Sequence, residues 1–190
     1  MTEEVEWWEY EDAAEMADAV AGDLQFVIES AIDARGAAVI ALAGGKTPAP
    51  IYAKLAQAKL DWKRVTIVPT DERVVPLGDP LSNVTMIGKT FIPKGARVIP
   101  IVPQATSDYK AAGRSADALM QDLHWPLDLC LLGMGEDGHT ASSSPAQTMT
   151  RPCPGRVSAA RWGSCPSRCR PRRRSRASRC HARASSPPRR

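Results

Sequence analysis

The sequence predicts an α/β fold in which an open, mainly parallel sheet carries helices on both faces. Four short apolar runs have the length and composition of buried strands, and stretches with helical periodicity separate them along the chain. A chain of 190 residues is long enough for one domain with a sizeable core. The sheet is expected to be truncated after the fourth strand. The expected strands are residues 37–42, 65–68, 97–101 and 127–132, and the later helices are residues 83–91 and 107–123.

The first helix and strand have the clearest patterns. Residues 11–34 are expected to form an amphipathic helix that ends at a cap on Gly36. A continuous apolar strand over residues 37–42 follows. Thr47 is then expected to cap the next helix and Pro48 to take its first position, where proline is favoured. The apolar residues that recur in the first helix are Met16, Val20, Leu24, Val27, Ile28 and Ala31.

The same alternation continues after the second strand. Residues 70–82 are expected to form a polar loop, and Ser82 to cap the short helix that follows. Pro100 weakens the third strand because proline has no amide hydrogen to donate. In the fourth strand, Cys130 is expected to be a small core residue.

Charge divides the chain into a body, residues 1–145, and a tail, residues 146–190. The body holds all 21 acidic residues and 12 of the 25 Lys and Arg, a balance of −9. The tail holds the other 13 basic residues, all of them Arg, with no acid, no Ile or Leu, and one aromatic residue, Trp162. Without a periodic apolar face the tail cannot bury enough surface to order itself, so we expect it to be disordered.

The compartment is predicted from the N-terminus and the hydropathy pattern. The first residues are acidic, which argues against a signal or transit peptide. No run of about 18 apolar residues occurs, so no membrane span or membrane partner is expected. We therefore expect a cytoplasmic protein.

Polar clusters follow three of the expected strands closely, at residues 44–48, 71–83 and 133–142. In open α/β sheets, ligands bind beyond the carboxyl ends of the strands. Topology alone therefore predicts that the three clusters converge on one site.

The first cluster has the chemistry of a phosphate site. Gly44 and Gly45 allow backbone N–H groups to turn towards a ligand, and Lys46 and Thr47 add further donors. A nucleotide P-loop is excluded, because that motif needs a glycine where Ile40 stands. A tight turn without any ligand is the alternative that the residues leave open.

Charged residues open the second cluster. The guanidinium of Arg73 has the geometry to fork onto a phosphate or carboxylate, with Asp71 or Glu72 to orient it. A solvated loop would carry the same charges, and the residues alone do not decide between the two.

Glycines shape the third cluster around His139. Gly133, Gly135 and Gly138 match the dinucleotide fingerprint G-x-G-x-x-G, but two carboxylates stand where a pyrophosphate would lie, and no acid follows Asp137 to bind a ribose. An imidazole in water titrates near neutral pH, so a histidine here suits general base catalysis. A structural histidine is the open alternative.

Together these segments resemble the 6-phosphogluconolactonase family. In the family's order and spacing, the matching segments are residues 43–48, 70–76, 82–83 and 132–142. The resemblance covers about residues 5–142. It implies a modified Rossmann-like fold and hydrolysis of 6-phosphoglucono-δ-lactone to 6-phosphogluconate in the pentose phosphate pathway, without metal or organic cofactor.

The resemblance also implies roles for individual residues. His139 would be the base that activates water against the lactone carbonyl, and Asp137 would help to place it. The partner would be a small phosphosugar lactone, whose dianionic phosphate needs donors at one end of the site. The implied substrate-binding residues are Gly44, Gly45, Lys46, Thr47, Asp71, Arg73, Ser82 and Asn83.

Glucosamine-6-phosphate deaminases are the nearest enzymatic alternative. They share the fold that the resemblance implies, and they also carry a glycine-rich loop and a Gly-His segment. The form Asp-Glu-Arg-x-x-Pro at residues 71–76 and His-Thr-Ala-Ser at residues 139–142 favour the lactonase.

The resemblance stops within its last motif. The family continues from Thr-Ala-Ser into Leu-Phe-Pro, whereas Ser142 is followed here by Ser143, Ser144 and Pro145. We expect the tail to be out-of-frame translation of GC-rich coding sequence, which tends to give Arg, Pro, Ala, Ser, Gly and Cys. Adding or removing one base near codon 143 should then restore a family-like continuation. The chain as written is expected to have impaired activity.

Three other interpretations of the tail stay open. A genuine Arg-rich arm would bind nucleic acid through phosphate contacts, and only then would nucleic acid be a partner. A zinc module is disfavoured, because Cys153, Cys165, Cys169 and Cys180 do not form two close pairs. A disulfide scaffold is opposed by the expected cytosolic context.

Overall fold

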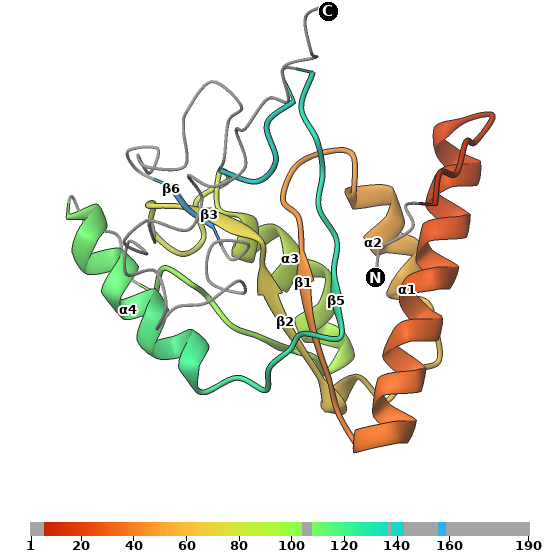
Figure 1. The fold of residues 1–190 in the computed structure, drawn as a ribbon, viewed down its shortest axis with the longest axis horizontal. Helices are drawn as coiled ribbons and strands as arrows, with labels where there is room; N and C mark the ends of the chain where they lie inside the picture. The colour runs from red at the N-terminus through yellow and green to blue at the C-terminus, as the bar shows by residue number, and fades with distance from the viewer. Residues whose placement is uncertain (1–5, 104–107, 137, 143–155, 159–190) are drawn as a thin grey trace, which may run out of the picture.

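The computed structural model describes residues 6–103, 108–136, 138–142 and 156–158. Its centre is a four-stranded parallel sheet in the order β4-β2-β1-β5, with helices on both faces (Figure 1). The predicted α/β class and all four predicted strands are confirmed, although the last two strands are short. The strands are β1 Ala38–Leu42, β2 Val65–Pro69, β4 Arg97–Val98 and β5 Leu129–Cys130.

Helices cover the two faces of the sheet through two separate apolar clusters. The helices are α1 Ala13–Arg35, α2 Ala49–Leu55, α3 Asn83–Phe91 and α4 Tyr109–Gln121, with the 3-10 turns η1 Trp62–Arg64 and η2 Ile92–Lys94. Ile40, Leu42 and Ile67 pack with α1, α2 and α3, whereas Ala41 and Val68 pack with α4. Side chains alternate between the faces of a strand, which divides the core in this way. Among the described helices, none has both the length and the apolar composition needed to cross a membrane.

β1 is the central strand that positions the site. All five of its residues are buried. It pairs along its whole length with β2, and through Ile40 and Ala41 with β5. Because these strands are parallel, their carboxyl ends meet at one edge of the sheet, where the three polar clusters begin.

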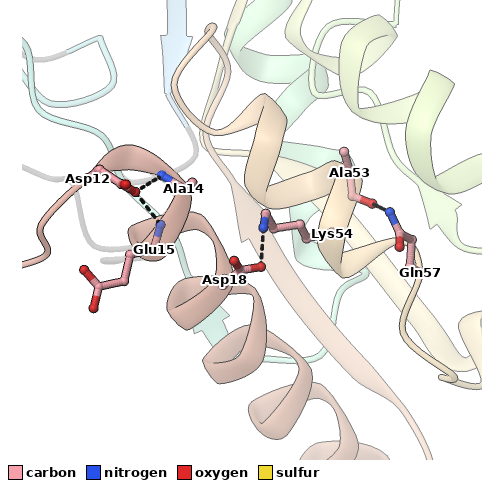
Figure 2. A network of polar contacts seen from close by, with 7 residues as sticks. All are labelled: Asp12, Ala14, Glu15, Asp18, Ala53, Lys54 and Gln57. Carbon is pink, nitrogen blue, oxygen red and sulfur yellow. Dashed lines mark hydrogen bonds and ion pairs between the residues drawn. The ribbon is translucent and has the colours of Figure 1, made fainter.

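Polar contacts fix the start of α1 and join it to α2 (Figure 2). The Asp12 carboxylate accepts hydrogen bonds from the backbone N–H groups of Ala14 at 2.7 Å and Glu15 at 2.8 Å. An ion pair between Asp18 of α1 and Lys54 of α2 connects the two helices. The first turns of α1 are therefore held against α2, the helix that follows residues 44–47, the glycine-rich loop.

Two predicted helix caps are confirmed. Gly36 ends α1 with a φ of 79°, and its N–H donates to Ile32 O at 2.7 Å. Ser82 precedes α3, where its Oγ accepts a hydrogen bond from the Thr85 N–H at 3.2 Å. Both caps follow from local chemistry that the sequence carries.

The predicted cap at Thr47 is wrong. α2 begins at Ala49, and Pro48 precedes the helix instead of opening it. The reason is a tight turn in which the Ala49 N–H donates to Lys46 O at 3.3 Å. Thr47 and Pro48 belong to that turn, so Thr47 is left exposed, at a cavity beyond the carboxyl ends of the strands.

A short strand lies in the loop that was expected to be irregular. β3, Asp71–Arg73, pairs antiparallel with β6, Arg156–Ser158, in a second, two-stranded sheet. Acidic residues are depleted in strands, so nothing in the residue types of this segment predicts β3. Within the tail, the structure describes only the three residues of β6. The other tail residues, for which disorder is expected, lie outside the described residues.

The predicted core position of Cys130 is wrong. In the described sheet, β5 has a neighbour on one side only, and Cys130 is exposed. Leu132, just beyond the strand, is 43% exposed. Leu129 and Leu131 do pack against the core, which explains the apolar composition of this run. The described parallel sheet thus ends at its fourth strand, with an edge open on one side.

Candidate active site

A cavity of about 480 Å³ lies beyond the carboxyl ends of β1, β2 and β5. All three polar clusters contribute to its wall, so their predicted convergence is confirmed. Met16 and Val20 of α1, together with Leu131 and Leu132, add an apolar side. This apolar side could not be predicted from the sequence, because it depends on how α1 lies against the sheet.

A buried tyrosine holds the start of the glycine-rich loop. Tyr52 of α2 donates its phenolic hydrogen to Ala43 O at 2.6 Å. Burial raises the pKa of Tyr52, so the hydroxyl remains a donor. Gly45 has a φ of 107°, in the left-handed region that favours glycine. The loop therefore turns sharply and carries the exposed side chain of Lys46 to the cavity.

Glu72 is 2% exposed, and its carboxylate caps α3. Oε1 accepts hydrogen bonds from the backbone N–H groups of Arg73 and Asn83, both at 2.8 Å. Oε2 accepts from the Val84 N–H at 2.7 Å and from Ser82 Oγ at 3.2 Å. A negative charge at the positive end of a helix is stabilising. Glu72 thus holds the main chain of Arg73, and its role is to join β3 to α3.

Arg73 lines the cavity. Its Nη1 donates to Leu81 O at 2.8 Å. Its Nε is buried and has no hydrogen-bond partner among the described residues. A guanidinium fixed on one side in this way leaves donors for an anion on the other, and the contact to phosphate or carboxylate stays a prediction.

Asp71 joins the second and third clusters. Its side chain is buried, and both of its carboxylate oxygens accept hydrogen bonds. Asn83 Nδ2 donates to Asp71 Oδ1 at 3.1 Å and to the Asp71 backbone oxygen at 2.8 Å. Ser142 Oγ donates to Asp71 Oδ2 at 2.9 Å. Ser142 was not among the predicted site residues, because nothing local indicates a partner so distant in sequence.

His139 lies in a tight turn after β5. Gly138 N–H donates to Gly135 O at 2.8 Å, and Gly135 N–H donates to His139 O at 2.8 Å. Gly138 has a φ of 77°, so the turn requires glycine there. His139 is half-buried and lines the cavity. The glycines thus shape a loop that delivers His139, as the sequence predicts.

The predicted site residues that the structure describes gather around this cavity. Ser82 is not one of the residues that line the cavity, and its hydroxyl donates to Glu72 Oε2. Asp137 lies outside the described residues, so its role stays a prediction. Within the described ranges, no group of three or more His, Cys, Asp and Glu is placed to hold a metal ion. The predicted site residues that line the cavity are Gly44, Gly45, Lys46, Thr47, Asp71, Arg73, Asn83 and His139.

Comparison with known sequences extends the motif resemblance. The profile of the family described as glucosamine-6-phosphate isomerases/6-phosphogluconolactonase matches residues 11–168, which runs beyond Ser142, where the motif resemblance ends. A 6-phosphogluconolactonase of Mesorhizobium japonicum is 39% identical over 142 residues, covering 73% of this chain and 59% of the relative. The chain therefore spans about three fifths of the length of this relative.

Solved structures share the fold. A 6-phosphogluconolactonase from Shewanella baltica superposes with a TM-score of 0.68 at 26% identity, covering 74% of this chain and 61% of the other. A monomeric glucosamine-6-phosphate deaminase superposes with a TM-score of 0.65 at 24% identity, covering 76% and 61%. At that identity the second likeness shows the fold alone. Both agree with the fold expected from the motifs.

Proposed function

Because the chain belongs to the family of glucosamine-6-phosphate isomerases and 6-phosphogluconolactonases, we propose that it hydrolyses 6-phosphoglucono-δ-lactone to 6-phosphogluconate. The observation that carries the proposal is the meeting of the glycine-rich loop, Arg73 and His139 at one cavity. The 39% identical relative is named a 6-phosphogluconolactonase, which supports the lactonase over the deaminase.

In the proposed reaction, His139 acts as general base. It removes a proton from a water molecule while the water oxygen bonds to the lactone carbonyl carbon. The tetrahedral intermediate then collapses, and the bond from that carbon to the ring oxygen breaks. The ring oxygen takes the proton back from the imidazolium, which leaves an open-chain acid and regenerates the neutral base. Asp137 is proposed to help place His139.

The phosphate of the substrate is proposed to bind at the opposite wall. Lys46 and Arg73 supply positive charge there, and the Thr47 hydroxyl and the backbone N–H groups of Gly44 and Gly45 supply further donors. Donors at one end and a base at the other hold the lactone carbonyl near the attacking water. Such positioning is a large part of enzymatic rate enhancement.

The matched part spans 59% of the Mesorhizobium relative. We propose that the Arg-rich sequence of residues 146–190, which differs from the family's continuation after Ser142, leaves the turnover below that of the relative. A cytoplasmic location and a small phosphosugar lactone as partner are part of the same proposal. Nucleic acid is a partner only if the Arg-rich tail is genuine, which salt-dependent binding with and without residues 146–190 would test.

The test is a lactone hydrolysis assay on the whole chain. Glucose 6-phosphate and its dehydrogenase supply the lactone in place, and spontaneous hydrolysis is subtracted. We expect activity that His139→Ala abolishes and that His124→Ala retains, because His124 is exposed and does not line the cavity. Release of ammonia from glucosamine 6-phosphate instead would favour the deaminase. A folded chain inactive on both substrates would refute the proposal.

A further inference from the structure

The carboxylate of Asp71 has no oxygen left without a donor, although Asp71 lines the cavity. Oδ1 accepts from Asn83 Nδ2 and Oδ2 accepts from Ser142 Oγ. Asp71 is only 8% exposed. A carboxylate engaged in this way is a poor ligand for a substrate that is itself anionic, and its hydrogen bonds point to the loops around it.

Asn83 connects Asp71 to the glycine-rich loop. Its Nδ2 bonds twice to Asp71, at the backbone oxygen and at Oδ1. Its own N–H is held by Glu72 Oε1 at 2.8 Å. The same side chain lies directly against Gly44, so close that a Cβ at residue 44 would overlap it. The position of Asn83 thus sets how near the glycine-rich loop lies to β3.

Ser142 connects Asp71 to the loop that carries His139. It follows His139 by three residues and is half-buried. The residue between them and next to Ser142, Ala141, has a φ of 52°, a conformation that non-glycine residues adopt only when their surroundings hold them there. The hydrogen bond from Ser142 to Asp71 is a contact that holds this end of the loop.

We propose that Asp71 is the positioning residue of the site, which fixes the His139 loop through Ser142 and the glycine-rich loop through Asn83. The proposal rests on the proposed lactonase function and adds a role for Ser142 and Asp71 that is distinct from substrate binding. It joins the wall that carries the base to the wall that carries the phosphate donors. A base misplaced by about 1 Å can lose on the order of 100-fold in rate.

The central test compares Ser142→Ala with Ser142→Thr, which keeps the hydroxyl. We expect Ser142→Ala to lower kcat on the order of tenfold with KM nearly unchanged. Ser142→Thr should recover most of the loss. Asp71→Ala should lower kcat at least as much, because it also removes the acceptor of Asn83. Adding Ser142→Ala to it should cost little more, because Ser142 acts through its bond to Asp71. Ser115→Ala, an exposed serine on α4, is the control.

Hydrogen exchange supplies a readout that does not depend on turnover. Loss of the Ser142 hydroxyl should speed exchange in residues 133–142 and leave α1 unchanged. If Ser142→Ala keeps both full kcat and wild-type exchange, the positioning role is overturned. A raised KM at unchanged kcat would also overturn it, because that result marks a substrate contact. If the wild type is inactive but Ser142→Ala still speeds hydrogen exchange in residues 133–142, the lactonase proposal is wrong. The structural role of the hydrogen bond between Ser142 and Asp71 would then still be supported.

Discussion

The side chain of Asn83 occupies the space in which a Cβ of residue 44 would stand, with its Oδ1 2.0 Å from that position on Gly44. Asn83 cannot move aside freely, because it is buried and its Nδ2 is bonded to Asp71. Gly44 is therefore required by packing. Its neighbour Gly45 is required for a different reason, its φ of 107°.

Gly44→Ala should lower the free energy of unfolding by about 1–3 kcal/mol, the usual range for overpacking. It should also lower lactone turnover, because the displaced Asn83 disturbs Asp71. Urea unfolding and the lactone assay measure the two effects. Gly113→Ala on α4 is the matched control, because an added Cβ there meets nothing within 4 Å. That variant should gain up to about 1 kcal/mol from helix propensity. Equal stability of Gly44→Ala and wild type would contradict the close approach.

The contact between Gly44 and Asn83 illustrates what the sequence could and could not predict. The glycine-rich loop was recognised from neighbouring residues, but the reason expected for Gly44 was access of the backbone to a ligand. The packing reason comes from a residue in another polar cluster. Strands β1 and β2 and the caps Gly36 and Ser82 were predictable, because periodicity and capping depend on near neighbours.

Long-range contacts account for the features that the sequence did not predict. The burial of Glu72 depends on the four donors that α3 and the adjoining chain present to it. The role of Tyr52 depends on where β1 ends. The exposure of Cys130 depends on what lies beside β5, which an apolar run cannot reveal. In each case the sequence shows the chemistry of the residue, whereas its contacts depend on the fold.

Glu72→Gln should destabilise the chain by about 1.5–3 kcal/mol, the range for hydrogen bonds to a charged group. The four donors around Glu72 need an acceptor on both oxygens. An amide NH2 would face N–H or O–H donors on one side and would leave them unpaired. The favourable charge at the start of α3 would also be lost. Thermal or urea unfolding measures the change.

Glu136→Gln is the matched control for this substitution. Glu136 is exposed, so the same chemical change should alter stability by less than about 0.5 kcal/mol. Similar stability of Glu72→Gln and Glu136→Gln would show that the carboxylate of Glu72 is not needed to join β3 to α3.

Tyr52→Phe should cost about 1–3 kcal/mol, because it leaves the Ala43 carbonyl without its donor in a buried place. The ring itself should keep its packing, including its edge contact with Phe91 at a centroid distance of 5.7 Å. Replacing the hydroxyl group with a hydrogen atom therefore isolates the contribution of the hydrogen bond. Urea unfolding of the variant beside wild type at neutral pH provides the measurement.

The pH dependence of the same pair gives an independent check. Burial raises the pKa of Tyr52 above its ordinary value of 10.0, so the folded chain keeps this proton where the unfolded chain releases it. The free energy of unfolding therefore falls as pH rises above about 10, and below that pH this group makes no pH-dependent contribution. Tyr52→Phe lacks this effect. The difference in free energy of unfolding between the wild type and the variant should therefore become smaller above about pH 10. A constant gap would indicate that Tyr52 titrates alike in both states.

The exposed edge of β5 predicts a reactive thiol at Cys130. Replacing Cys153, Cys165, Cys169 and Cys180 with serine leaves Cys130 as the single cysteine. We expect iodoacetamide to modify it in the native chain. Burial of part of the side chain raises the pKa of the Cys130 thiol, so the reaction should be slower than that of free cysteine near neutral pH and should accelerate as pH rises.

The urea-unfolded variant gives the reference rate for this reaction, and its thiol should react at the rate of free cysteine. A native rate within about tenfold of that reference would support an open β5 edge, because a thiol that is fully buried is inert. A native thiol that stays unmodified at every pH would instead show that Cys130 is covered in the whole chain. The cover would then be another copy of the chain or residues beyond the described ones, which repeating the labelling after dilution and after deletion of residues 146–190 would distinguish.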